Sequence, residues 1–71
     1  MVTESIIRLP VVQARTGLSR SEIYRREGLG LFPQRVSIGA RSVGWVSGEV
    51  QAWIEARIKD SRERSRQGGE A

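Results

Sequence analysis

Four polar side chains lie on one side of a predicted helix over residues 20–27. They are Arg20, Ser21, Tyr24 and Arg25, at offsets that cluster on a helix with 3.6 residues per turn. A guanidinium donates paired hydrogen bonds to guanine edges and to phosphate, and hydroxyl groups contact both. The face therefore predicts contact with nucleic acid. The alternatives are a solvated polar face on an ordinary surface helix and, for Tyr24 alone, packing at the helix rim.

A capping sequence marks the start of this helix. Ser19 is followed three residues later by Glu22, the S-x-x-E pattern in which each side chain satisfies a free backbone N–H group of the other residue. Ile23 then supplies an inward apolar side chain. The sequence predicts a helix from Arg20 to about Glu27, with the arginine in its first turn, where recognition helices usually meet base edges.

Another helix precedes this one. Leu9-Pro10 is typical of a helix start because proline is tolerated at the first helical position, and Gly17 is suited to a left-handed cap at the end. Only residues 16–19 connect the two predicted helices. A turn this short holds two helices at a steep angle, which predicts a helix-turn-helix.

The pattern changes to a period of two between residues 35 and 46. Apolar side chains alternate with small ones on both sides of a predicted four-residue turn at 39–42. This predicts a β-hairpin, with Val36 and Ile38 in one strand and Val43 and Trp45 in the other. A hairpin beside a helix-turn-helix forms a wing.

Three residues of the hairpin are candidate DNA contacts. Arg41 and Ser42 lie in the predicted turn, where an arginine enters a minor groove or contacts phosphate. Arg35, at the start of the hairpin, is a further candidate phosphate contact. The alternative for Arg41 is an exposed loop arginine with no partner.

The last predicted helix follows Ser47, a favourable N-cap residue, and carries one apolar stripe that includes Trp53 and Ile58. No apolar residue occurs between Ile58 and Ala71, which predicts a fraying helix end and a disordered charged tail over residues 59–71. Residues 1–58 then form a mainly α-helical winged helix-turn-helix domain, with three helices and a two-stranded wing. A short extended piece at residues 6 and 7 is expected to contact the core.

Two tryptophans are candidates for base stacking or a ligand cage. Trp45 and Trp53 each lie on an apolar period, one in a predicted strand and the other in a predicted helix. Both are therefore predicted to be core residues, with Phe32 and Ile54 packed against them.

Composition narrows the function classes further. The 71 residues include no cysteine and no histidine, so we expect no disulfide, no metal site, no cofactor and no enzymatic activity. No segment resembles a membrane span or a signal peptide, which favours a cytoplasmic, nucleoid-associated protein. The net charge is +4, and eleven of the twelve basic residues are arginine. That excess favours an anionic partner, although solubility and a GC-rich genome are alternative causes.

The order and spacing of these motifs resemble the AlpA-type prophage regulators, small proteins with a MerR-like winged-helix fold related to excisionases. The resemblance covers about residues 6–58. The matching pieces are Arg8-Leu9-Pro10 with Val12, residues 16–21 with Ile23-Tyr24-Arg25, Phe32-Pro33 with Val36, Gly39 and Arg41, Val43 with Trp45, and Ser47 with Glu49-Val50 and Ala52-Trp53-Ile54.

The resemblance implies DNA binding through the second helix and the wing, in transcription regulation or site-specific recombination. The residues implied as DNA contacts are Ser19, Arg20, Ser21, Tyr24, Arg25 and Arg41. Two positions depart from the family. Arg26 stands where an apolar residue is usual, which predicts a looser or earlier helix end, and Arg35 stands where proline is common, which extends the basic surface.

The primary hypothesis is a sequence-specific, DNA-binding transcription regulator of a prophage or other mobile element. An excisionase that recruits an integrase would use the same surface, and a small protein-binding adaptor that uses residues 59–71 is a third alternative. One domain contacts too few base pairs for a unique genomic address, so a dimer or a cooperative array is expected. RNA polymerase is a further candidate partner, whereas a membrane is not.

Overall fold

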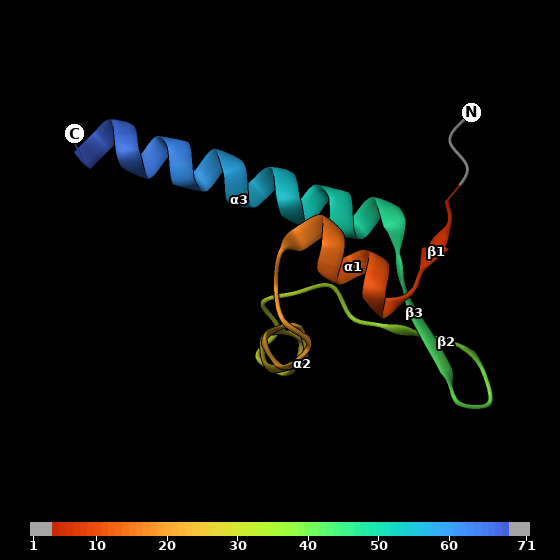
Figure 1. Ribbon diagram of the computed structural model, residues 1–71. Coiled ribbons are helices and arrows are strands. Elements are labelled where there is room, and N and C mark those ends of the chain that lie inside the picture. The colour runs from red at the N-terminus through yellow and green to blue at the C-terminus, as the bar shows by residue number, and fades with distance from the viewer. Residues whose placement is uncertain (1–3, 69–71) are drawn as a thin grey trace.

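The computed structural model describes residues 4–68 of the chain, and side-chain surroundings through Ser65. Three helices and three short strands follow one another as shown in Figure 1. Their bounds are β1 Ile6–Ile7, α1 Leu9–Thr16, α2 Arg20–Gly28, β2 Val36–Gly39, β3 Ser42–Val46 and α3 Ser47–Gly68. The predicted winged helix-turn-helix architecture is confirmed.

The start and end signals of the first two helices act as expected. Pro10 lies in the first turn of α1, and Gly17 ends this helix with a φ of 76°, a left-handed conformation that glycine adopts without steric cost. Three residues later α2 begins at Arg20 and extends through Gly28. The early end suggested by Arg26 is therefore wrong, because the helix continues past that residue.

The sheet contains one strand more than the sequence predicted. Strand β3 lies between β1 and β2 and pairs antiparallel with both. The extended piece at Ile6 and Ile7 pairs with Val46 and Trp45, so it anchors the hairpin to the domain. A strand of two residues carries too weak a pattern to reveal its partner from sequence alone.

The turn of the hairpin is also tighter than expected. Gly39 pairs with Ser42, which leaves only Ala40 and Arg41 between the strands instead of four residues. The Arg41 N–H donates to the Gly39 carbonyl at 3.0 Å. Ser42 therefore belongs to β3 and is half-buried, whereas Arg41 alone of the two predicted tip contacts lies in the turn.

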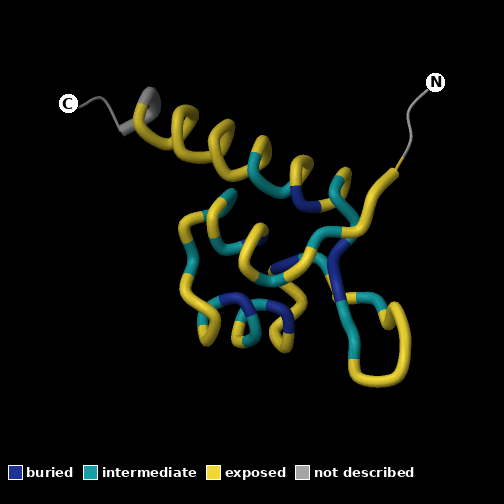
Figure 2. Tube along the Cα trace, turned by 45° about the vertical axis from the view of Figure 1, so that its right-hand side comes forward, coloured by how far each residue is buried: buried dark blue, intermediate teal, exposed yellow. Residues whose placement is uncertain are grey.

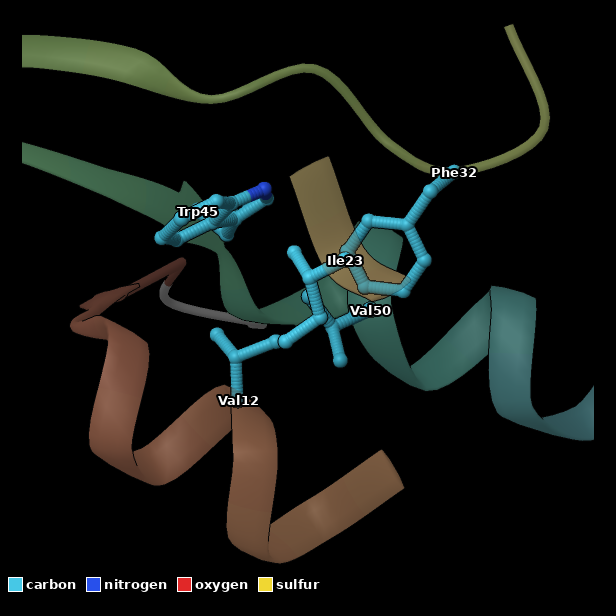
Figure 3. Close-up of a cluster of buried hydrophobic side chains, with 5 residues drawn as sticks. All are labelled: Val12, Ile23, Phe32, Trp45 and Val50. Atoms are coloured by element: carbon cyan, nitrogen blue, oxygen red, sulfur yellow. The ribbon is translucent and has the colours of Figure 1, made fainter. Parts of the chain in front are cut away.

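Five buried side chains from all parts of the domain form the core. Trp45 of β3 lies among side chains from both turn-linked helices, the following loop and the start of α3, as Figure 3 shows. The members are Val12, Ile23, Phe32, Trp45 and Val50. Trp45 is confirmed as a core residue with no exposed surface. Trp53 is only half-buried; its ring packs edge-on against Phe32, with centroids 4.9 Å apart.

Helix α3 extends far beyond the core. It is helical through Gly68, so the predicted fraying and disorder are not observed at residues 59–68; residues 69–71 lie outside the described part. The distal half is exposed along its whole described length (Figure 2). Arginine, lysine, glutamate and glutamine favour the helix here, and oppositely charged residues recur at intervals of three or four positions. None of the described helices has a stretch long and apolar enough to span a membrane.

Candidate nucleic-acid interface

Only half of the predicted capping box forms at the start of α2. The Ser19 hydroxyl accepts a hydrogen bond from the Glu22 backbone N–H at 3.2 Å, as expected. The Glu22 carboxylate, however, accepts hydrogen bonds from Arg25 and Arg26 instead of reaching back to Ser19. Charge-assisted bonds to two guanidiniums are stronger than one bond to a backbone amide, which explains the difference.

Glu22 thereby organises the exposed side of α2. Its two oxygens accept from Arg25 Nε at 2.9 Å and Nη2 at 3.0 Å, a forked arrangement, and from Arg26 Nε at 3.0 Å. The hydrogen bonds from Arg25 and then Arg26 lower the pKa of Glu22 from 4.5 to about 2. Arg25, predicted to contact DNA, keeps 56% of its side chain exposed.

The stability that this ion cluster contributes should depend on pH. Because the folded-state pKa of Glu22 lies below its ordinary value, the contribution is fully present above about pH 4.5 and is lost as the pH falls towards 2. Unfolding temperatures of the wild type and of Glu22→Gln should differ most near neutral pH and converge in acid. The difference should be small, since exposed ion pairs contribute little. A gap that stayed constant down to about pH 2 would contradict this origin.

Tyr24 lies where α2 meets the core. The side chain is half-buried, with its ring centroid 6.3 Å from that of Trp45, so the rim packing considered for this residue is observed. Two guanidiniums lie over the ring, that of Arg20 at 5.7 Å and that of Arg35 at 5.3 Å from its centroid. Cation–π contacts of this kind restrain both arginines on the surface.

Sequence reasoning missed Glu27, which is the only charged residue buried within the described part of the chain. Its carboxylate accepts hydrogen bonds from the Arg35 backbone N–H at 2.6 Å and from Arg35 Nη1 at 2.7 Å. Gln34 Nε2 donates to the Glu27 carbonyl at 2.9 Å. No short motif links positions 27 and 35, because the intervening loop brings them together only in the folded chain.

The predicted DNA contacts lie on two elements, α2 and the hairpin. Figures 1 and 2 both place α2 and the hairpin turn on the side of the molecule away from α3, with α1 between. Ser19, Arg20 and Ser21 are exposed at the start of α2, and Arg41 is exposed in the turn. Arg20 and Arg41 form no salt bridge with any residue in the range 4–65.

A helix-turn-helix whose second helix lies on the same side of the domain as a β-hairpin defines a winged helix-turn-helix protein. Residues 5–58 match the family model described as prophage CP4-57 regulatory protein (AlpA). The chain therefore belongs to the AlpA family, in agreement with the resemblance that its motifs indicated.

The chain is also similar to two known proteins, one of which carries the name of this family. A protein of Escherichia coli K12, described as DNA-binding transcriptional activator AlpA, is 36% identical over 62 residues, which cover 76% of this chain and 86% of the relative. A protein of Enterobacteria phage P4, described as uncharacterized protein ORF88, is 46% identical over 55 residues. That alignment covers 78% of this chain but only 62% of the phage protein, so the chain spans less than two thirds of it.

Proposed function

We propose that this protein is a sequence-specific, DNA-binding transcription regulator of a prophage or other mobile element. The start of α2 enters the major groove, and the hairpin contacts the adjacent backbone or minor groove. The observation that carries the proposal is that α2 and the hairpin turn lie on the same side of the domain (Figures 1 and 2). Each carries an exposed arginine, Arg20 and Arg41, that forms no salt bridge with the other residues in the range 4–65. The E. coli relative is described as a DNA-binding activator, which agrees with it.

The contacts have different proposed roles. Arg20 and Arg25 contact base edges, while Ser19 and Ser21 contact phosphate or base edges near the N-terminus of α2. Tyr24 contributes its exposed rim to the same surface. Arg35, Arg41 and Ser42 provide phosphate or minor-groove contacts from the hairpin. In this arrangement α2 supplies base specificity, and the hairpin fixes orientation on the duplex.

Selection of bound duplexes from a random DNA library tests the proposal. A short motif should be enriched, and binding to it should weaken steeply with salt because arginine–phosphate contacts release counterions. A footprint on the enriched DNA should then show repeated half-sites, since one domain covers too few base pairs for a unique address. Recovery of no common motif at any salt concentration would reject sequence-specific binding.

Arg41 should contribute to DNA binding at the expense of hairpin stability. Its backbone φ of 126° lies in a region that residues other than glycine rarely adopt. Arg41→Gly should therefore stabilise the fold by about 1 kcal/mol through relief of strain, while DNA affinity falls several-fold. Thermal unfolding and fluorescence anisotropy on the same samples measure the two effects.

Arg41→Ala is the matched control for this prediction. It removes the same guanidinium but retains a Cβ at the positive φ, so it should lose DNA affinity without the gain in stability. If Arg41→Gly bound DNA as tightly as the wild type, Arg41 would not be a DNA contact.

A further inference from the structure

We propose that Glu27 is a positioning residue that holds the hairpin in place relative to the recognition helix and thereby sets DNA specificity. This inference rests on the proposed function. It concerns a residue that, being buried, makes no contact with DNA itself. Glu27 lies in the last turn of α2, and its partner Arg35 immediately precedes β2, so the contact joins the two proposed DNA-binding elements.

Three hydrogen bonds make this junction. The two oxygens of the Glu27 carboxylate accept separately from the backbone and the side chain of Arg35, while the Glu27 carbonyl accepts from Gln34. The first of these fixes the chain where it enters β2, since the N–H group cannot move without moving the backbone. A carboxylate has two acceptor oxygens and no donor, and therefore matches this pair of donors.

Of the two side chains that form this ion pair, only that of Glu27 is buried. The Glu27 side chain is 7% exposed, whereas that of Arg35 is 47% exposed. A buried carboxylate that lost its partner would be strongly unfavourable, which favours a single position for Arg35. The exposed part of the Arg35 side chain remains available to a phosphate.

The same contact extends to the exposed face of α2. The Arg35 guanidinium lies over the Tyr24 ring, and that of Arg20 lies over the ring as well. Glu27 therefore restrains Arg35 directly. Through the Arg35 guanidinium it also restrains the Tyr24 ring on α2. Restraint of this kind is what specific binding requires, because contacts displaced by a fraction of an ångström lose their geometry.

The test compares affinity for the selected motif with affinity for a scrambled duplex of equal length. Glu27→Gln keeps the shape of the side chain but offers one acceptor oxygen, and its NH2 group opposes a donor of Arg35. We expect affinity for the motif to fall, while affinity for the scrambled duplex stays equal or rises because a negative charge is removed. The ratio of the two affinities should drop by about tenfold, the size of one lost base contact.

The ratio separates positioning from folding. A variant that is merely less folded loses the same factor on both duplexes, which leaves the ratio unchanged. Glu55→Gln, at an exposed position of α3, removes the same charge and should also preserve the ratio. Glu27→Asp keeps the charge but is too short to reach both donors, so it should lower the ratio without changing affinity for the scrambled duplex.

The outcomes distinguish a failure of the proposed function from a failure of the positioning role alone. A wild-type protein that does not distinguish the two duplexes would reject the proposed function itself. A wild type that does distinguish them, with both Glu27 variants at the same ratio, would reject the positioning role alone. If Glu27→Gln does not fold, the ratio of the charge-conserving Glu27→Asp variant decides.

Discussion

Trp45→Ala should lower the free energy of unfolding by about 3–5 kcal/mol, the cost of removing a large buried aromatic side chain. The indole is fully buried in the core cluster, which also contains side chains from α1, α2, the loop after α2 and α3. A chain of this size has a total stability of roughly 4–11 kcal/mol, so the variant should be largely unfolded or unfold at a much lower temperature. Urea titration followed by circular dichroism measures the loss.

Trp45→Phe separates the loss of packing from the loss of the indole N–H group. Trp45 Nε1 has no hydrogen-bond partner within the described residues, so removing it sacrifices no such bond. The phenylalanine variant should therefore lose less than half as much stability as the alanine variant.

Trp53→Phe is the matched control at the half-buried tryptophan. Trp53 Nε1 donates to the Leu31 carbonyl at 2.8 Å, and the loss of this bond should cost about 1 kcal/mol. If Trp45→Ala lost no more stability than Trp53→Phe, the indole of Trp45 would not be the centre of the core.

Arg20→Ala should weaken binding to the selected motif by about 1–3 kcal/mol, or roughly 5- to 150-fold, if the guanidinium makes a paired contact with a base. Arg20 is exposed at the first position of α2 and forms no salt bridge with any residue in the described range. Within the described residues, its guanidinium is restrained only by the cation–π contact with the Tyr24 ring. Competition binding against duplexes altered at single positions measures the effect and identifies the base.

The fold of this variant should be intact, since surface substitutions of this kind change stability by about 0.5 kcal/mol or less. Arg62→Ala is the control, because it removes the same charge from an exposed position on α3, away from the proposed interface. It should change affinity only slightly, through screened long-range electrostatics. Equal losses in the two variants would mean that Arg20 contributes charge alone.

Two alternatives for Arg20 differ in their dependence on sequence and salt. A base contact predicts a loss that is largest at one base-pair position of the motif. A phosphate contact predicts a uniform loss across sequences, with the slope of log affinity against log salt reduced by about one. The same set of titrations therefore distinguishes the two contacts.

Local signals were sufficient for the first two helices, for the start of α3 and for most of the hairpin. Pro10, Gly17 and Ser19 act within a few residues of their own position, so their effects on helix ends follow from backbone geometry alone. The alternation around Trp45 likewise predicts a strand with this side chain in the core, as the structure has it. Such features depend little on the rest of the chain.

Features that depend on distant partners were not predictable. The pairing of β1 with β3 brings together residues about forty positions apart, from a strand too short to show a pattern. Helix α3 extends beyond its predicted end for a different, local reason, because charged residues with high helix propensity continue the helix although no apolar residue follows Ile58. The altered capping box likewise has a local cause, because Arg25 and Arg26, three and four residues along α2, donate charge-assisted hydrogen bonds to the Glu22 carboxylate.

The sequence by itself determines which polar side chains share the exposed face of α2 that indicates nucleic-acid contact. Residue type and helical spacing place Arg20, Ser21, Tyr24 and Arg25 together, because spacing along a helix fixes angular position. The same spacing places Glu22 three residues from Arg25 on α2, so their ion pair also follows from position along the helix. Tertiary structure alone decided the pairing of Glu27 with Arg35, because the buried Glu27 acquires its partner only when the loop after α2 closes back on the helix.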